Sequence, residues 1–127
     1  MEDMSGCTGI FAWDKDHKLA AQHAFSGSEK NHVTNFAGEL DKAKFTPDHV
    51  AIAADTGDKY KAAVDVLQEK YKLDPARQIT RHHYENTPGN ELGRHRFTAI
   101  FGDPNRHVKG EPYTAEPKEP GTPPEIL

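Results

Sequence analysis

The sequence predicts a single small α/β domain, in which a mixed or antiparallel sheet carries helices packed on it, followed by a proline-rich tail. Three observations predict this fold. Two apolar runs lie on either side of a short polar turn within residues 10–25, which is typical of a β-hairpin. Two stretches with helical spacing of apolar residues alternate with short apolar runs that suit strands. The composition then changes, so we expect a domain over 1–103 and an extended tail over 104–127.

The hairpin is the first predicted element and is formed by residues 10–13 and 19–25. If residues 14–16 form the loop, Cys7 lies directly opposite His23. Directly opposed residues in an antiparallel pair have Cβ atoms roughly 5 Å apart, a separation that suits proton transfer from a thiol to an imidazole. A slip of one residue would turn His23 to the other face of the sheet.

Two helices are predicted from apolar side chains that recur on one face. The first helix has Asn31 as its expected cap. Its apolar positions are Val33, Phe36, Ala37 and Leu40. The second helix is expected over 58–73 and is ended by Pro75. Its apolar positions are Tyr60, Ala63, Val64, Leu67 and Tyr71. We expect both stripes to face the core rather than a cofactor.

Three further strands are predicted around these helices. Residues 49–54 form an unbroken apolar run, which fits a central strand buried on both faces. Residues 78–84 alternate weakly, and residues 96–101 form the last strand. Six of the nine prolines follow this strand, so the tail is expected to be extended, either as a passive segment or as a contact for a partner.

Length and composition restrict the class of protein. A chain of 127 residues has room for one core, and we expect it to act as a monomer. The net charge of −4, from 16 basic and 20 acidic residues, gives no reason to expect nucleic acid as a partner. No stretch approaches the roughly 18 apolar residues of a membrane span, and the N-terminus does not have the pattern of a secretory signal. One cysteine excludes an internal disulfide, and a reducing compartment would suit a reactive thiol.

That single cysteine, Cys7, is the strongest candidate for chemistry. The thiolate is the nucleophilic form of cysteine, and a neighbouring histidine can hold it deprotonated. His23 is the expected partner, and the amide of Cys7 is a candidate donor to an oxyanion. Gly6 and Gly9 leave room for a substrate beside the backbone. The alternative is that Cys7 is a small buried apolar side chain, as lone cysteines often are.

The residues around Cys7 resemble a known family. Met4-Ser5-Gly6-Cys7 is similar to the Leu-Ser-Gly-Cys motif of the cytotoxic necrotizing factors and Burkholderia lethal factor, toxins that deamidate glutamine side chains on host proteins. Histidine follows the cysteine at similar spacing in those toxins. The bacterial chemoreceptor glutamine deamidase is similar as well, with Gly-Ser-Cys before a strand, a turn containing Asp, and a strand that ends at histidine. The resemblance covers residues 4–26.

The resemblance implies a deamidase-like α/β sandwich and a hydrolase with Cys7 and His23 as catalytic residues. Gly6 would lie near the oxyanion, and Thr8 and Gln22 would flank the pair as candidates for substrate contact, with plain structural roles as the alternative. The implied partner is a protein that carries a target glutamine, and no cofactor is implied. The implied setting is a virulence toxin or effector that is secreted or delivered into a host cytosol, and otherwise a cytoplasmic enzyme.

One part of the family pattern differs here. The third catalytic element of the family lies a few residues before the cysteine and is often a threonine or a backbone carbonyl. Glu2 and Asp3 stand at those positions in this chain. The role could fall to a carbonyl within residues 1–3, to a residue further upstream in a longer natural sequence, or to another side chain.

Two other classes of function stay open. The domain could be a catalytically inactive protein-binding module in which Cys7 is structural, or the same pair could serve an amidase, peptidase or transglutaminase. A metal site is not expected. The adjacent His82 and His83 would point to opposite faces of a strand, and no pattern of zinc ligands is present.

Overall fold

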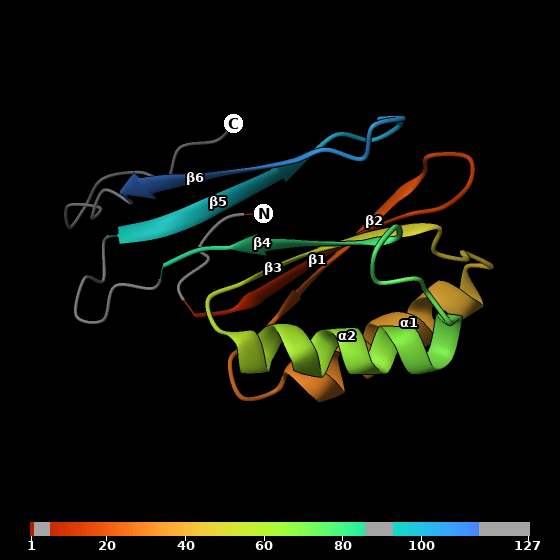
Figure 1. Cartoon of the computed structure of the whole chain (residues 1–127), viewed down its shortest axis with the longest axis horizontal. Helices are drawn as coiled ribbons and strands as arrows, with labels where there is room; N and C mark the ends of the chain where they lie inside the picture. Colours follow the sequence, from red (N-terminus) through yellow and green to blue (C-terminus); the bar gives the residue numbers. More distant parts are fainter. Residues whose placement is uncertain (2–5, 86–92, 115–127) are drawn as a thin grey trace, which may run out of the picture.

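The computed structural model describes residues 1, 6–85 and 93–114. Two helices lie on one face of a four-stranded sheet, and a two-stranded hairpin lies on the other face (Figure 1). The elements in chain order are β1 (Thr8–Trp13), β2 (Leu19–Ala24), α1 (Glu29–Lys42), β3 (His49–Ala54), α2 (Gly57–Tyr71), β4 (Ile79–His83), β5 (Gly93–Ala99) and β6 (Val108–Thr114). The predicted α/β class, with helices packed on a mixed sheet, is confirmed.

The four-stranded sheet has the strand order β2-β1-β3-β4. β1 pairs antiparallel with both β2 and β3, while β3 and β4 are parallel and joined through α2. The run at residues 49–54 was predicted to be central, and this is confirmed because β3 lies between two strands. Within the described residues, no helix is long and apolar enough to cross a membrane.

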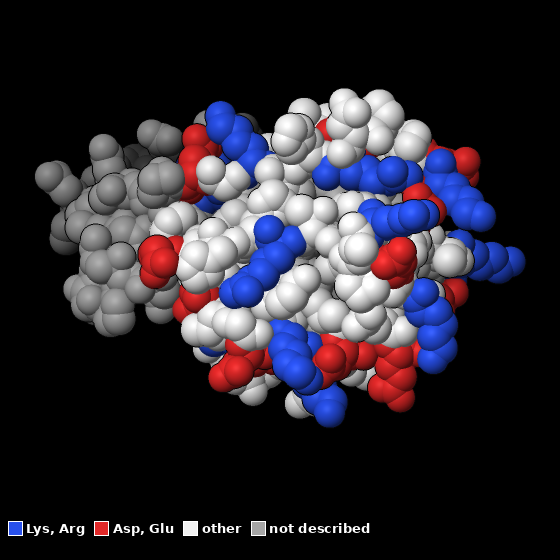
Figure 2. Space-filling view, viewed as in Figure 1, with Lys and Arg blue, Asp and Glu red and all other residues white. Residues whose placement is uncertain are grey.

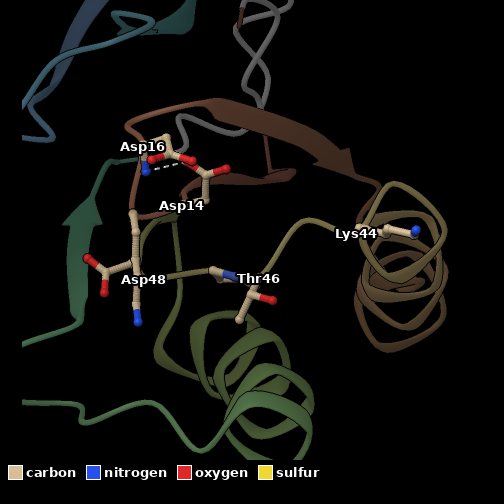
Figure 3. A pocket seen from close by; sticks show the side chains of 7 residues that line it. Asp14, Asp16, Lys44, Thr46 and Asp48 are labelled. Atoms are coloured by element: carbon tan, nitrogen blue, oxygen red, sulfur yellow. Dashed lines mark hydrogen bonds between the residues drawn. The ribbon is translucent and has the colours of Figure 1, made fainter.

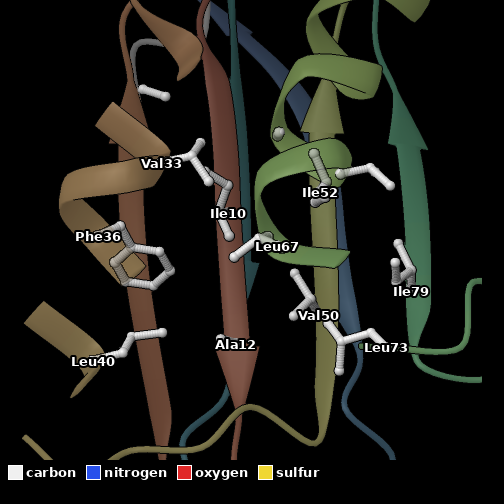
Figure 4. Close-up of a cluster of buried hydrophobic side chains, with 13 residues drawn as sticks. Ile10, Ala12, Val33, Phe36, Leu40, Val50, Ile52, Leu67, Leu73 and Ile79 are labelled. Carbon is white, nitrogen blue, oxygen red and sulfur yellow. The ribbon is translucent and has the colours of Figure 1, made fainter. Parts of the chain in front are cut away.

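Alternation along the strands divides the buried side chains into two cores. Ile10 and Ile52 point toward the helices and pack with Val33, Phe36 and Leu67 (Figure 4). The side chains of the opposite face point toward the β5–β6 hairpin. That second core contains Phe11, Trp13, Ala51, Ala53, Tyr84, Phe97 and Val108. Both faces of the sheet are therefore covered, as side-chain alternation on apolar central strands requires.

Both helices form where the apolar spacing predicts them. α1 begins at Glu29, so its N-cap is Ser28, and the predicted cap at Asn31 is wrong. Glu29 is buried at this end, and its carboxylate accepts a hydrogen bond from the Gly27 amide. α2 begins after Thr56, whose hydroxyl accepts from the Lys59 amide at 3.3 Å.

The β1–β2 turn is longer than predicted, and this changes the strand register. Trp13 pairs with Leu19, and Gly9 pairs with His23, so the predicted pairing of Cys7 with His23 is wrong by two residues. The Asp14 carboxylate explains the longer turn, since it accepts hydrogen bonds from the amides of Asp16 and Lys18, both at 2.9 Å. A shift of two residues keeps every side chain on its predicted face.

The β5–β6 hairpin contains a strand, β6, that the sequence did not predict. β6 lies beyond residue 104, in the stretch expected to be tail, and it pairs antiparallel with β5. Val108 is buried in the second core, so residues 108–114 belong to the domain. Residues 115–127 of the expected tail lie outside the described residues.

Polar contacts join the turn of the β5–β6 hairpin to the four-stranded sheet. The Arg106 guanidinium contacts the Asp48 carboxylate at 2.6 Å, just before β3. The Gly102 amide donates to the His17 carbonyl at 2.9 Å, in the β1–β2 turn. These contacts fix the hairpin over the sheet at the end opposite Cys7.

Substitution of Gly110, which the Phe97 ring approaches closely, tests whether the packing of β6 contributes to stability. A Cβ at Gly110 would lie 2.5 Å from the Phe97 ring, which is itself buried. We therefore expect Gly110→Ala to lower the free energy of unfolding by about 1–3 kcal/mol, because the ring must shift in a packed core. Urea denaturation measures this.

The control is Gly38→Ala in α1, where a Cβ meets nothing within 4 Å. That change should raise stability by about 0.5–1 kcal/mol, because alanine favours a helix over glycine. Equal effects of the two substitutions would contradict the packing of β6 on the sheet.

Candidate functional site

The candidate residues lie at one end of the four-stranded sheet. Cys7 immediately precedes β1, and His23 is the penultimate residue of β2. Asp55 and Tyr84 directly follow β3 and β4, and Lys59 lies in the first turn of α2. Ligands of open α/β sheets bind outside the carboxyl ends of the parallel strands, which is the end where these residues lie.

Cys7 and His23 lie on the same face of the sheet. Gly9 pairs with His23, and Cys7 is two residues before Gly9, so Cys7 and His23 are diagonal rather than opposed. Diagonal neighbours in a regular antiparallel pair are roughly 7–8 Å apart, with a somewhat shorter separation between their Cβ atoms, so Cys7 and His23 are further apart than the sequence predicted. Cys7 packs against the hairpin-facing core and is partly exposed. The edge of the Phe25 ring contacts the His23 imidazole, with ring centroids 5.5 Å apart.

The backbone of Gly6 and Cys7 is held by two side chains that are distant in sequence. The Gly6 amide donates to the Tyr84 hydroxyl at 3.0 Å, and that hydroxyl donates to the Cys7 carbonyl at 2.5 Å. The Lys59 ammonium donates to the Gly6 carbonyl at 2.7 Å. Gly6 has a φ of 97°, in the left-handed region that favours glycine, so the bend before the cysteine suits this residue.

Burial and a nearby carboxylate keep the Tyr84 phenol protonated. Lys59 forms an ion pair with Asp55 at 3.0 Å, and the Asp55 side chain is only 6% exposed. Burial raises the pKa of Tyr84 well above its ordinary value, and the nearby Asp55 carboxylate raises it further. The Tyr84 phenol therefore stays protonated at neutral pH and can donate to the Cys7 carbonyl.

The structure separates the other predicted site residues from this pair. Thr8 is fully buried on the helix-facing side and pairs with Ala24, so its side chain is turned away from Cys7. Gln22 pairs with Ile10 on that same side, and its amide donates to the His23 carbonyl at 3.0 Å. Neither side chain shares a face with the cysteine. The Gly6 amide is already bonded to Tyr84, which leaves the Cys7 amide as the predicted oxyanion donor.

The predicted third element falls mostly outside the described residues. Of residues 1–3, only Met1 is described, and its carbonyl accepts a hydrogen bond from the Phe97 amide at 2.7 Å. That carbonyl is thus paired with β5. Gln22 does contact the backbone of the histidine, but through the His23 carbonyl rather than through the imidazole.

No local pattern in the sequence indicates Tyr84, Lys59 or Asp55 as part of this site. Tyr84 falls inside a predicted strand, Lys59 falls inside the predicted second helix, and Asp55 lies between the predicted central strand and that helix. Tyr84 is 78 residues from Gly6, and Lys59 is 53 residues from it. Only the parallel pairing of β3 with β4, which ends both strands beside Cys7, could have indicated the contacts.

Other features of the surface do not involve Cys7. A hollow of about 320 Å³ lies between the β1–β2 turn and the segment before β3, at the far end of β1, where Asp14, Asp16 and Asp48 line it (Figure 3). Another hollow of about 430 Å³ lies beside β4 and shares Tyr84 with the candidate site. Basic and acidic side chains are interspersed on the face shown in Figure 2. Among the described residues, no group of three or more potential ligands is placed to hold a metal ion.

Comparison with known proteins identifies no family for this chain. No protein-family model matches the chain, and no curated protein or solved structure matches it either. The resemblance to glutamine deamidases therefore depends on the residues around Cys7 and His23.

The left-handed backbone at Gly6 leads to a prediction. Gly6→Ala should lower the free energy of unfolding by about 1–2 kcal/mol, because a Cβ strains a positive φ. The same change should slow alkylation of Cys7 by iodoacetamide, since the bend that presents the thiol is disturbed. Alkylation is followed by intact mass.

Gly102→Ala is the matched control for this prediction. Gly102 has a φ of 78° and open space around it, and its amide bonds the His17 carbonyl at the end of the domain opposite Cys7, so it carries similar backbone strain away from the thiol. It should reduce stability without changing the alkylation rate. If both variants alkylate at the native rate, the bend at Gly6 has no influence on the thiol.

His82 gives a prediction about pH. Burial lowers the pKa of His82 below its ordinary value of 6.5, and the nearby His107 lowers it further. The unfolded chain therefore takes up this proton first, and stability should fall as the pH drops below about 6.5. In His82→Gln, urea denaturation at a series of pH values should show a shallower fall. The pKa of His49 is lowered by burial as well, so adding His49→Gln should flatten the slope further, and unchanged slopes would contradict the assignment.

Proposed function

We propose that this chain is a protein glutamine deamidase with Cys7 as nucleophile and His23 as general acid and base. The observation that supports the proposal is the position of both side chains on one face of the sheet, at the end where β3 and β4 terminate. The motif around Cys7 and the partial exposure of the thiol agree with a nucleophile that a substrate can reach.

The reaction would proceed through a thioester. The Cys7 thiolate attacks the carbon of a glutamine carboxamide, and the carbonyl electrons move to oxygen. The amide of Cys7 is the proposed donor to this oxyanion, since the Gly6 amide is occupied by Tyr84. The oxyanion then collapses, and His23 gives its proton to the departing ammonia. His23 next takes a proton from water, whose hydroxide attacks the thioester and releases glutamate and the thiolate.

The proposed product is a protein with one new carboxylate. A neutral amide becomes a charged group, and such a change can break an interface or disable a catalytic glutamine. A role as a toxin or effector, acting on a host protein, is part of this proposal.

A protein-binding module is the second candidate, and exposed apolar side chains favour it. Ile100 is 64% exposed and Phe101 is 71% exposed at the turn between β5 and β6, and Phe25 is 60% exposed beside His23. Exposed apolar groups of this size are common at protein interfaces. In this candidate, Cys7 would be structural.

The pH dependence of alkylation separates the two candidates. Iodoacetamide should react with Cys7 well below about pH 8 in the native chain, because a paired histidine accepts the thiol proton. His23→Ala should lose this reactivity, while His17→Asn, in the turn of the same hairpin, should keep it. A Cys7 that reacts like a free thiol in all three chains would favour the binding module.

The reaction itself is tested on proteins from a cell lysate. Peptide mapping by mass spectrometry should find glutamine-to-glutamate conversion with the native chain and none with Cys7→Ser. Adding a primary amine separates the acceptors: incorporation of the amine in place of water would identify a transglutaminase. Conversion that persists in Cys7→Ser would contradict the proposal that Cys7 is the nucleophile.

A further inference from the structure

Three of the four backbone polar atoms of Gly6 and Cys7 are bonded to side chains from two distant segments, the end of β4 and the first turn of α2. Tyr84 accepts from the Gly6 amide and donates to the Cys7 carbonyl. Lys59 donates to the Gly6 carbonyl from the first turn of α2. Two side chains thereby fix the peptide on each side of the nucleophile.

The Lys59 contact also determines the direction of the Cys7 amide, the fourth backbone polar group of Gly6 and Cys7. The described chain contains no cis peptide bond, so the Gly6 carbonyl and the Cys7 amide point in opposite directions. Because the Gly6 carbonyl points at the Lys59 ammonium, the Cys7 amide is turned away from α2. An amide held in a fixed direction is what an oxyanion donor requires.

Both supporting side chains are themselves held in place. The Tyr84 ring packs against Phe97 and His95 of β5, with ring centroids 5.6 Å and 5.0 Å away. Lys59 is only 21% exposed and is paired with Asp55. Residues held this way can transmit an orientation to the backbone that they contact.

We infer that Tyr84 and Lys59 are positioning residues for the Cys7 nucleophile, an inference that rests on the proposed deamidase function. Neither side chain reacts with the substrate. Tyr84 fixes the ends of the Gly6–Cys7 segment, and Lys59 fixes the peptide between the two residues. The thiol and the Cys7 amide are thereby presented together at the mouth of the site.

Substitution of each positioning residue tests the inference. Tyr84→Phe removes only the hydroxyl, and Lys59→Met removes the donor while keeping the aliphatic chain. Both should slow alkylation of Cys7 at neutral pH by about tenfold or more, since small misplacements of a reacting group carry large rate costs. Lys59→Arg should restore most of the native rate, because the guanidinium can also donate to the Gly6 carbonyl.

Two matched controls come from the same helix. Tyr71→Phe removes a hydroxyl that bonds the Ala37 carbonyl, and Lys61→Met removes an exposed ammonium that is paired with Asp65. Both should alkylate at the native rate. Because Lys59→Met leaves Asp55 buried without its cation, the double variant Asp55→Asn/Lys59→Met is used if the single variant does not fold.

Hydrogen exchange provides a readout that does not depend on reactivity. The Gly6 amide should exchange about tenfold faster in Tyr84→Phe, because it loses its only side-chain acceptor among the described residues. The same amide should be unaffected in Tyr71→Phe. Nuclear magnetic resonance resolves this amide individually.

The outcomes separate this inference from the proposed function. If Tyr84→Phe and Lys59→Met alkylate at the native rate while His23→Ala does not, the positioning role is overturned and the deamidase proposal survives. If the native thiol reacts like a free cysteine, the deamidase proposal fails. Faster Gly6 exchange in Tyr84→Phe would then still support the fixed backbone, and unchanged exchange would overturn it.

Discussion

The burial of β1 on both faces is the constraint on which the rest of the structure depends. All six residues of this strand are buried, with Ile10 and Ala12 turned to the helices and Phe11 and Trp13 turned to the hairpin. A strand with two apolar faces needs a cover on each, so helices on one side alone would leave Trp13 in water. The β5–β6 hairpin thus completes the domain, and Cys7, immediately before β1, packs against the core between the sheet and this hairpin.

Most elements of the sheet-and-helix part could be predicted because their signal lies within each segment. The spacing of Val33, Phe36 and Leu40 and the unbroken run of β3 are visible in the sequence alone. β6 has no such signal, because its inward position at Gly110 carries no side chain, and Val108 is a single apolar residue rather than an alternating run. The Phe97 ring of the partner strand occupies the space over that glycine, so the apolar group belongs to β5.

The candidate site could be predicted only as far as it depends on neighbouring strands. Side chains alternate between the two faces of a strand, so a register shift of two residues leaves Cys7 and His23 on the same face. The longer turn formed around Asp14 nevertheless separates them along the strands. Tyr84 and Lys59 approach the cysteine through the crossover that brings β3, α2 and β4 to one edge. No local pattern encodes a contact of that kind, since it follows from the pairing of whole strands.

The geometry links the reactivity of the thiol to the packing of the hairpin. Tyr84 reaches the Gly6–Cys7 segment from a ring that packs against Phe97, and Phe97 is fixed in turn by its close contact with Gly110. A disturbance of β6 therefore reaches the backbone of Gly6 and Cys7 through two ring contacts, from Gly110 to Phe97 and from Phe97 to Tyr84. The β5–β6 hairpin contains the one described strand that the sequence does not predict, and it is also the layer that supports the proposed chemistry. It completes the second core and packs against Tyr84, the residue that holds the Cys7 backbone.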